Sequence, residues 1–549
     1  MNHSIRLETR LLSSLEKVFA DSGTIGPEYK AATALRNETF SFQVAYRASD
    51  KIQGLKVKAD SRLEPYIQLR SVGLVPSELP VYTNHDDDVL RTTPGLYPDP
   101  LYPIDPEGLT VPGGQWRSVW IIVDLNGEAE PGNYPIRISF ANQNGELLGE
   151  ETFHLEVLEP LLPEQTLIHT EWFHCDCLSN YYRVEMFSEP HWKLVERYVK
   201  TAVDHGMNMI LTPIFTPPLD TAVGGERKTA QLVDVWKNGG EYAFGFDKLA
   251  RWIELCSGLG IRYFEFAHLF TQWGAKHAPK IMGWEDGTYR RLFGWETDAT
   301  SDEYRRFLDT FLPELVRFIR QHGLEKRSYF HVSDEPHLND LESYRAASEI
   351  LDKHLADFPR IDALSDFAFY GQGLVPHPVP STDHLEPFLE HGVEGLWTYY
   401  CCSQGIDVSN RFFSFPSARN RILGMQLYKF GIKGFLHWGY NFWNTQYSRK
   451  AINPFQVTDA GLAFPSGDAF VVYPGEDGPI ESLRLKVFVE GLQDMRALQL
   501  LEQLVGRGKA VQVLEEGLDR PITFKQYPRS AEWLLAKREQ INRLIAQHA

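Results

Sequence analysis

The sequence predicts an α/β protein in which a (β/α)8 TIM barrel follows an antiparallel β-sandwich and precedes a short helical C-terminal tail. Two patterns indicate this. Up to about residue 162, short β-prone runs are separated by turns rich in Pro and Gly, which is typical of a sandwich. From residue 166 onward, strand-like runs alternate with helical ones, which is typical of a barrel of parallel strands. We therefore expect a sandwich domain at residues 1–162, a barrel domain at 163–508 and a helical tail at 509–549.

The sandwich is predicted from β-prone runs in the first unit. Trp116–Leu125 and Tyr134–Phe140 are strand-like, and Pro131–Asn133 predicts a turn directly before the second run. Phe40–Tyr46 and Glu151–Leu158 alternate in the same manner. We expect these runs to pair as antiparallel strands.

Eight strand-like runs predict the barrel. They are Leu167–His174, Asn208–Phe215, Tyr263–Phe270, Tyr329–Glu335, Ile361–Phe367, Gly395–Cys401, Gly434–Tyr440 and Ala469–Tyr473. The helical runs are Trp192–Val203, Phe246–Leu259, Tyr304–His322, Leu341–Leu355, Ser417–Phe430 and Ser482–Leu504. The turn residues Asn238–Gly240 also predict an inserted hairpin. An open doubly wound sheet is the alternative, but no Gly-rich phosphate-binding motif follows a predicted strand.

Composition narrows the functional classes. The formal net charge of −18 disfavours nucleic acids and anionic membrane surfaces as partners. No run of 18 apolar residues predicts a membrane span, and the first ten residues lack the apolar core of a signal peptide. The five cysteines are sparse and odd in number, unlike a disulfide framework. We therefore expect a cytoplasmic protein.

The most informative motif is Ser333–Pro336, in which Asp334 and Glu335 end a β-prone run. Carboxylates at the end of a buried strand cost free energy unless they are paired or used. At the carboxyl end of a barrel strand, such a pair indicates catalysis, with one acid keeping a proton and the other a charge. Because neighbouring residues of a regular strand point to opposite faces, we expect a bend or bulge, which Pro336 favours. A structural salt bridge or a loop cap is the alternative.

Polar and aromatic residues at other predicted strand ends complete a candidate sugar site. Aromatic rings cover the apolar face of a sugar, while Asn, His and Glu bond its hydroxyls. The predicted binding residues are Glu171, Trp172, His268, Trp397, Tyr399, His437, Trp438, Asn441 and Trp443. Core packing is the alternative for the aromatic residues, and a hydrogen-bonded core position is the alternative for the histidines.

We expect neither a metal ion nor a cofactor. His174–Cys177 and Cys401–Cys402 follow predicted strands, but the Cys-x-Cys spacing lacks the two-residue spacer of common zinc sites. The sequence has no Gly-x-Ser-x-Gly motif, so a serine hydrolase is weakly supported.

Several motifs resemble those of glycoside hydrolase family 123. They are Ser333–Pro336, Gly434–Trp438 with Asn441 and Trp443, Gly467–Gly475, Ser482–Arg484 and Gly491–Asp494. The segment around Pro131–Tyr134 is similar to part of the β-sandwich of that family. The resemblance implies a (β/α)8 catalytic domain behind a sandwich, with exo-acting β-N-acetylgalactosaminidase activity.

The resemblance also implies roles for the acid pair. Glu335 would protonate the glycosidic oxygen and later activate water. Asp334 would orient the substrate's 2-acetamido group, whose carbonyl oxygen attacks the anomeric carbon to form an oxazoline-type intermediate, as in substrate-assisted retention. Tyr399 would help to hold the acetamido oxygen. The chain departs from the family pattern at Lys486–Glu490 and at Met495–Arg496, so N-acetylglucosamine is the alternative sugar.

Two other functions stay open. One is a two-carboxylate glycosidase for sugars without an acetamido group, with Glu171 opposite Glu335. The other is a carbohydrate-binding protein without catalysis. The predicted partner is an oligosaccharide or glycoconjugate with a terminal β-N-acetylgalactosamine. The sequence leaves the linkage, the natural substrate and the oligomeric state open, and a homo-oligomer is compatible with it.

Overall fold

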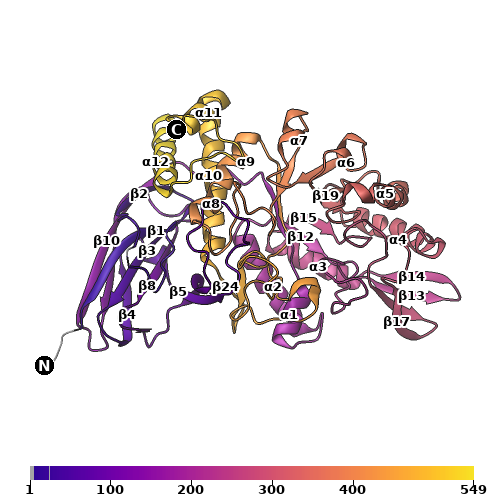
Figure 1. Cartoon of the computed structure of the whole chain (residues 1–549), viewed down its shortest axis with the longest axis horizontal. Helices are drawn as coiled ribbons and strands as arrows, with labels where there is room; N and C mark the ends of the chain where they lie inside the picture. Colours follow the sequence, from indigo (N-terminus) through magenta and orange to yellow (C-terminus); the bar gives the residue numbers. More distant parts are fainter. Residues whose placement is uncertain (1–4, 24) are drawn as a thin grey trace.

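The N-terminal part of the molecule consists of two five-stranded sheets, in the computed structural model of residues 5–23 and 25–549 (Figure 1). The strand orders are β1-β3-β8-β5-β6 and β2-β10-β9-β4-β7. The strands are β1 Leu7–Ser13, β2 Ala31–Leu35, β3 Thr39–Ala48, β4 Ile52–Asp60, β5 Ile67–Ser77, β6 Gly95–Pro103, β7 Leu109–Val111, β8 Trp116–Asp124, β9 Gly132–Ala141 and β10 Leu147–Leu158. All of the paired strands run antiparallel, as predicted, except that β2 and β10 pair in parallel.

Strand β8 joins two hydrophobic cores. Ile121 and Val123 belong to the core between the two sheets, whereas Trp120 and Ile122 belong to the larger core of the rest of the molecule. Neighbouring side chains of a strand point to opposite faces, so a strand buried on both faces needs a nearly continuous apolar run. The sequence of β8 has such a run because the sandwich packs against the following region.

From residue 168 onward, eight short parallel strands follow one another in cyclic order. Six form one sheet, β18-β15-β12-β11-β22-β21, and β19 and β20 form another. Isolated parallel bridges join the two sheets, Phe330 with Arg360 on one side and Ser381 with Tyr399 on the other. The strands are β11 Ile168–Glu171, β12 Met209–Thr212, β15 Tyr263–Phe266, β18 Ser328–Phe330, β19 Ile361–Leu364, β20 His377–Pro380, β21 Trp397–Tyr399 and β22 Gly434–His437.

One of the eight predicted strands is wrong. The segment Ala469–Tyr473 does not pair with the parallel strands, and the missing strand is β20, in which two of the four residues are proline. Proline cannot donate a backbone hydrogen bond, so the sequence of β20 resembles a loop. The chain is bound to its neighbours directly after β20, where the N–H groups of Ser381 and Thr382 donate to the carbonyls of Leu364 (3.3 Å) and Tyr399 (2.9 Å).

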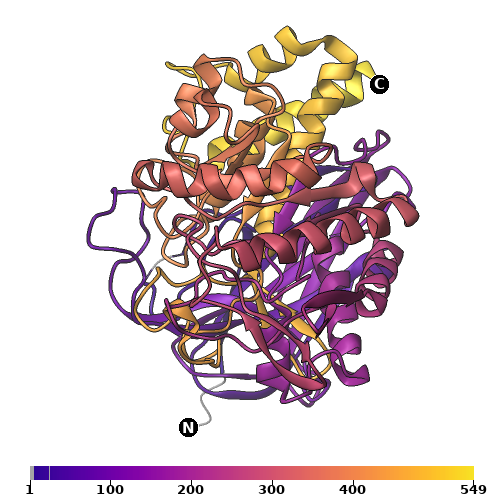
Figure 2. The ribbon, with the colours of Figure 1, turned by 90° about the vertical axis from the view of Figure 1, so that its right-hand side faces the viewer.

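Helices connect these strands and overlap all six of the predicted helical runs. In Figure 2, α4 and α5 cross the end of the molecule side by side. The hydroxyl of Ser301 caps α4 by accepting a hydrogen bond from the N–H of Tyr304. The helices are α1 Cys175–Tyr182, α2 Glu189–Asp204, α3 Asp247–Leu259, α4 Asp302–Gln321, α5 Leu341–Leu355, α6 Ala368–Gly371, α7 Glu386–Glu390, α8 Ser417–Arg421, α9 Leu423–Phe430 and α10 Leu483–Val505.

Short antiparallel hairpins are inserted into this region. The predicted hairpin is confirmed as β13 (Asp234–Asn238) and β14 (Glu241–Gly245), and it lies at the end of the molecule opposite the sandwich (Figure 1). The remaining strands are β16 Ile281–Glu285, β17 Thr288–Phe293, β23 Val472–Pro474 and β24 Pro479–Glu481. Strands β16 and β17 extend the first hairpin into a four-stranded sheet.

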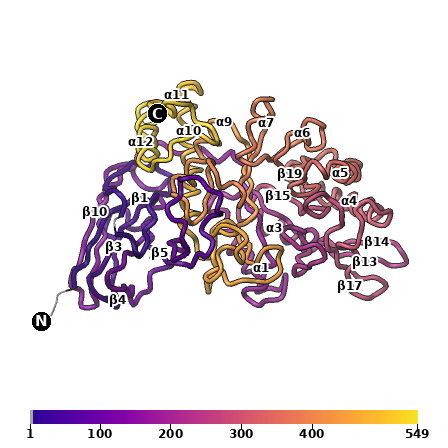
Figure 3. The backbone as a smooth tube through the Cα atoms, viewed as in Figure 1, coloured from indigo at the N-terminus to yellow at the C-terminus, as the bar shows by residue number. Residues whose placement is uncertain are grey.

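The C-terminal helices bridge the sandwich and the following region. Helices α11 (Arg507–Glu515) and α12 (Ala531–His548) follow α10, and α12 lies beside the sandwich strands (Figure 3). It contacts both α10 and β2. The buried Arg538 of α12 binds Asp494 of α10 and Glu38 of the sandwich. Among the helices of the described residues, none combines the length and the apolar character that crossing a membrane requires.

Candidate active site

A pocket of about 170 Å³ lies where the parallel strands end. Its lining comes from the segments at or beyond the carboxyl ends of β11, β12, β15, β18, β19, β21 and β22, which is where sites form in folds of alternating parallel strands and helices. The lining residues are Trp172, Leu219, Asp220, Gln272, Trp273, Asp334, Glu335, Ala363, Tyr399, Cys401, Cys402, Leu436, Trp438, Gln446, Tyr447 and Phe464.

The chain bends at the acid pair, so that Asp334 and Glu335 both line this pocket. Strand β18 ends at Phe330, and Glu335 adopts a left-handed backbone conformation with φ of 44°. This conformation is costly for a residue with a side chain and persists only where surrounding contacts enforce it. The N–H of Glu335 donates to the carbonyl of Ala363 (3.1 Å), and the carbonyl of Asp334 accepts from the N–H of Trp273 (3.0 Å).

Both carboxyl groups are half-buried and lie in an environment that favours a proton. Burial raises the pKa of Glu335, although a hydrogen bond from the Tyr399 hydroxyl to its Oε1 (2.6 Å) partly opposes this. Burial and the neighbouring Glu335 raise the pKa of Asp334 well above its usual range. The pair can therefore hold a proton at a pH at which ordinary carboxyl groups are ionised.

A buried ion cluster lies beneath the acid pair. The ring nitrogens of His331 bond Glu265 (2.5 Å) and Asp362 (3.0 Å), and these two carboxylates raise the pKa of His331 to about 10 against the effect of burial. Glu265 also accepts a hydrogen bond from the indole of Trp172 (2.7 Å). The cluster thus holds Trp172 in the pocket wall; its His331 lowers the pKa of Asp334, whereas its carboxylates Asp362 and Glu265 raise it.

His268, His331 and Asp362 offer ligand atoms within 4.8 Å of one another, as a metal site would. In the structure, both ring nitrogens of His331 are already used by carboxylates. The ring of His268 stacks on that of His331 with 4.1 Å between the centroids. This arrangement holds an imidazolium between two carboxylates, and a metal would have to displace one of these hydrogen bonds.

Trp438 forms a second aromatic wall, and a buried carboxylate positions it. Its indole N–H donates to Oδ2 of Asp468 (2.9 Å), which is fully buried. Asp468 belongs to the Gly467–Gly475 motif that the sequence singles out. The motif therefore supports the pocket from behind.

Six of the predicted binding residues do not line the pocket, and Glu171 differs most from its prediction. It is fully buried and receives two hydrogen bonds from Arg411, of 2.6 and 3.0 Å. Burial opposes ionisation, but Arg411 and His169 hold the pKa of Glu171 well below its usual range. Glu171 is thus an anion with a structural role, because Arg411 binds it. The two residues are 240 positions apart in the chain.

The other five are buried in the walls around the pocket. Trp397 begins β21, at the end of the strands far from the pocket, and its ring leaves no room for a side chain at Gly434. His268 lies under the stack with His331, and His437 lies 3.6 Å from Asp468. The amide of Asn441 bonds the backbone of His174, and the indole of Trp443 donates to the carbonyl of Val472. The strand-end positions were predicted, but the side chains turn into the core.

Sequence reasoning missed several lining residues, notably Asp220, Gln272 and Tyr447. They lie in long loops, where no periodic pattern marks a side chain as pocket-facing. Asp220, Trp273 and Tyr447 share with Glu335 a positive φ, of 38°, 57° and 60° respectively. Such strain at non-Gly residues clusters at functional sites. It is a property of the folded backbone, so the sequence held no signal for it.

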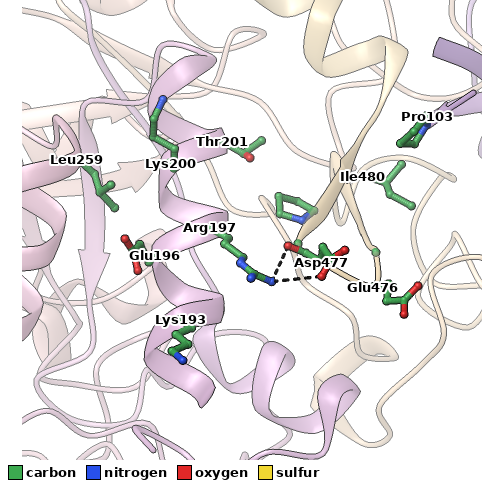
Figure 4. A pocket seen from close by; sticks show the side chains of 13 residues that line it. Pro103, Lys193, Glu196, Arg197, Lys200, Thr201, Leu259, Glu476, Asp477 and Ile480 are labelled. Atoms are coloured by element: carbon green, nitrogen blue, oxygen red, sulfur yellow. Dashed lines mark hydrogen bonds and ion pairs between the residues drawn. The ribbon is translucent and has the colours of Figure 1, made fainter. Parts of the chain in front are cut away.

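A larger groove of about 1000 Å³ lies elsewhere, between α2 and the β23–β24 hairpin (Figure 4). None of the predicted site residues lines it. Within the groove, Arg197 donates to the backbone carbonyl of Asp477 at 2.7 Å and lies 3.9 Å from its carboxylate. The pocket with the acid pair is therefore the candidate active site.

Comparison with known proteins adds independent information. The model of the catalytic domain of glycoside hydrolase family 123 matches residues 172–501. The solved structure of a family 123 glycoside hydrolase from Clostridium perfringens, studied for glycolipid glycan hydrolysis, aligns over 98% of this chain and 97% of that chain, with 17% identity and a TM-score of 0.76. A calcium-binding mutant of Bacteroides uniformis β-glucuronidase 2 aligns over 92% and 50% with 10% identity, but its TM-score of 0.30 supports no argument. No curated protein matches the sequence.

Proposed function

Because the chain belongs to glycoside hydrolase family 123, we propose that it is a retaining exo-β-N-acetylgalactosaminidase that uses substrate assistance. The observation that carries the proposal is that two adjacent carboxyl groups face one small pocket that three tryptophans also line. Such a pocket combines proton donors and acceptors with apolar faces, which is the chemistry that a sugar ring requires.

Glu335 is the proposed general acid. Its raised pKa favours the protonated form, and because the Tyr399 hydroxyl donates to Oε1, we assign the proton to Oε2. That proton passes to the glycosidic oxygen as the bond to the anomeric carbon breaks. The resulting carboxylate then accepts a proton from the water that opens the intermediate. In the structure Tyr399 contacts Glu335, so we assign its hydroxyl to the acid rather than to the acetamido oxygen.

Asp334 is the proposed partner of the substrate amide. When its carboxylate accepts a hydrogen bond from the acetamido N–H, the carbonyl oxygen becomes a better nucleophile and forms a new bond to the anomeric carbon. Hydrolysis of the resulting oxazoline restores the acetamido group and retains the anomeric configuration. This scheme needs no carboxylate on the opposite face of the ring, and therefore agrees with two adjacent acids.

The size of the pocket supports exo action. About 170 Å³ is well below the roughly 300–1,000 Å³ of sites that hold drug-sized ligands. It suits a single terminal sugar ring with the leaving group outside. The proposed substrates are oligosaccharides or glycoconjugates that end in β-N-acetylgalactosamine, and the cytoplasmic location stays a prediction.

The two-carboxylate alternative loses its nucleophile, because Arg411 binds Glu171 inside the core.

We also propose that the eight cyclically ordered strands form a (β/α)8 barrel. The parallel bridges at both edges of the six-stranded sheet support this. The domain bounds 1–162, 163–508 and 509–549 are proposed with it.

A panel of 4-nitrophenyl β-glycosides tests the function. We expect hydrolysis of the N-acetylgalactosaminide, no hydrolysis of the galactoside that lacks the acetamido group, and a β-configured first product in a proton NMR time course. The thiazoline derived from N-acetylgalactosamine should inhibit, because it mimics the cyclic intermediate. Equal turnover of the two galacto substrates, or an α-configured first product, would contradict substrate assistance. Binding of N-acetylgalactosamine without turnover would favour a silent carbohydrate-binding protein.

A further inference from the structure

Two pocket residues outside the acid pair, Asp220 and Gln272, form a linked unit. They come from the loops after β12 and β15, and both line the pocket. The backbone N–H of Asp220 donates to Oε1 of Gln272 at 2.5 Å. This contact fixes the side chain of Gln272 relative to the backbone of Asp220.

The backbone around Asp220 is held in place by a second loop. The N–H of Tyr447 donates to Oδ2 of Asp220 (2.9 Å), and the hydroxyl of Ser448 donates to the carbonyl of Asp220 (2.7 Å). Asp220, Tyr447 and Ser448 all have positive φ, of 38°, 60° and 53°. Two strained residues thus hold a third, Asp220, in the pocket wall, which indicates that its position matters for function.

These contacts leave one acceptor and one donor unfilled. Within residues 5–23 and 25–549, no hydrogen bond reaches Oδ1 of Asp220, and Nε2 of Gln272 is buried without a partner. Gln272 is 5% exposed. Unpaired buried polar groups are rare because they forfeit their hydrogen bonds with water. An unfilled acceptor and an unfilled donor on two residues that line one pocket are complementary to a hydroxyl group, which both donates and accepts.

Among the described residues, the Asp220 carboxyl has no arginine partner of its own. The nearest guanidinium, Arg227, donates to Asp176 (3.0 and 2.8 Å) and to His174 (3.0 Å). Burial raises the pKa of Asp220 to about 6, while the Tyr447 N–H and Arg227 lower it and Asp468 raises it further. A sugar hydroxyl can complete this unit, because in the part of the chain that the structure describes Arg227 donates elsewhere and leaves Oδ1 of Asp220 open.

We propose that Asp220 and Gln272 together bind a ring hydroxyl of the substrate and so set which sugar epimer the pocket accepts. A hydroxyl donates to Oδ1 of Asp220 and accepts from Nε2 of Gln272. A sugar whose hydroxyl points elsewhere leaves both groups unpaired, which is the physical basis of strong discrimination. The inference rests on the proposed function and deepens it, because it assigns specificity to residues outside the acid pair.

The first test combines Asp220→Asn with substrates that lack one hydroxyl. In the variant, the Asn oxygen faces the Tyr447 N–H, so its NH₂ group faces the pocket and cannot accept. We expect kcat/KM for the aryl N-acetylgalactosaminide to fall about 10- to 100-fold, mainly through KM. Among 3-, 4- and 6-deoxy substrates, the 4-deoxy compound, which lacks the hydroxyl that distinguishes galacto from gluco sugars, should lose activity with the wild type but hardly respond to the substitution. Asp477→Asn, at an almost fully exposed carboxylate, is the control and should match the wild type.

The second test is Gln272→Glu, which keeps the acceptor for the Asp220 N–H and replaces only the unfilled donor. We expect this substitution to leave the activity with the same deoxy substrate nearly unchanged. The preference for the galacto over the gluco substrate should fall at least 10-fold. In the wild type, KM should rise as the pH falls through about 6, because the protonated carboxyl no longer accepts. In Asp220→Asn this rise should disappear. An unchanged KM profile, or equal losses with all three deoxy substrates in every variant, would overturn the proposal.

Failure of this proposal can be told from failure of the proposed function. If Asp220→Asn lowers kcat about 10⁴-fold and azide restores turnover, Asp220 is a nucleophile and the hydroxyl-binding role is wrong. If the wild type hydrolyses no acetamido sugar, the proposed function fails. In that case, calorimetric affinities for N-acetylgalactosamine and N-acetylglucosamine decide the role of Asp220, because the wild type should prefer one epimer and Asp220→Asn should not.

Discussion

Two sets of carboxyl groups lie near the ends of the parallel strands, and their pKa values are shifted in opposite directions. Glu171, the last residue of β11, is enclosed and bonded twice by Arg411. Asp334 and Glu335, beyond the end of β18, face a pocket without an arginine on either carboxyl among the described residues. Burial opposes ionisation in both places, yet the pKa of Glu171 is lowered while those of Asp334 and Glu335 are raised.

The difference illustrates how a carboxyl group with a structural role differs from the two carboxyl groups for which we propose a catalytic role. A guanidinium that fits a carboxylate bidentately keeps it charged and occupies both of its oxygens. Where no guanidinium is present, as at the adjacent pair within the described part of the chain, burial raises the pKa, so one of the two carboxyl groups can keep a proton that it transfers. The predictions below test whether removing the acids at the two places has different consequences, activity at one and stability at the other.

Glu335→Gln should have the largest effect. Removal of a general acid costs about 10²- to 10⁴-fold in turnover, and we expect the upper end because an aryl glycoside with a poor leaving group depends fully on protonation. The melting temperature should stay close to that of the wild type. Steady-state kinetics and calorimetry measure both, and near-normal turnover of the variant would show that another residue supplies the proton.

Asp334→Asn should lower kcat by about 10²- to 10³-fold, comparable to the loss of one charge-stabilising contact in a transition state. Asn can still contact the amide, but it no longer carries the charge that polarises it. Added azide should not restore turnover, since the nucleophile belongs to the substrate. Formation of an azido sugar by the variant would instead indicate an enzyme carboxylate as nucleophile.

Arg411→Met should act on stability rather than on chemistry. It leaves the buried Glu171 carboxylate without its guanidinium partner, which costs about 3–5 kcal/mol. Urea unfolding measures this loss, and turnover per folded molecule should stay within about threefold. Glu171→Gln with Arg411→Met should recover part of the stability. A specific loss of kcat in the folded variant would return Glu171 to the list of catalytic candidates.

Tyr399→Phe should have the smallest effect and sharpen the assignment of the acid. The Tyr399 hydroxyl lowers the pKa of Glu335, so its removal raises that pKa further. The general acid must be protonated, and activity is therefore lost as the pH rises through its pKa. We expect the alkaline limb of the kcat/KM profile to move to higher pH, with about a 10-fold lower maximum. A limb that does not move would separate Tyr399 from the acid.

The turns, the helical runs and several strand-end residues of this protein can be predicted from its sequence. Asp334 and Glu335 precede a proline that ends regular pairing, so a bend that turns both acids to one side could be expected from Ser333–Pro336 alone. The hairpin at Asn238–Gly240 and the helical runs also follow from short-range patterns, because turn chemistry and helix periodicity involve residues only a few positions apart. For the same reason, Trp172, Tyr399 and Trp438 were found among the strand-end residues.

What only the tertiary structure decided involves residues far apart in the chain. Arg411 keeps Glu171 ionised although the two residues are 240 positions apart. Strand β20 pairs within the parallel strands although its two prolines are typical of a loop. Gln272 meets Asp220 across 52 positions, in loops without a periodic pattern. The pKa of each acid depends on such distant partners, because charge and desolvation act through space and not along the sequence.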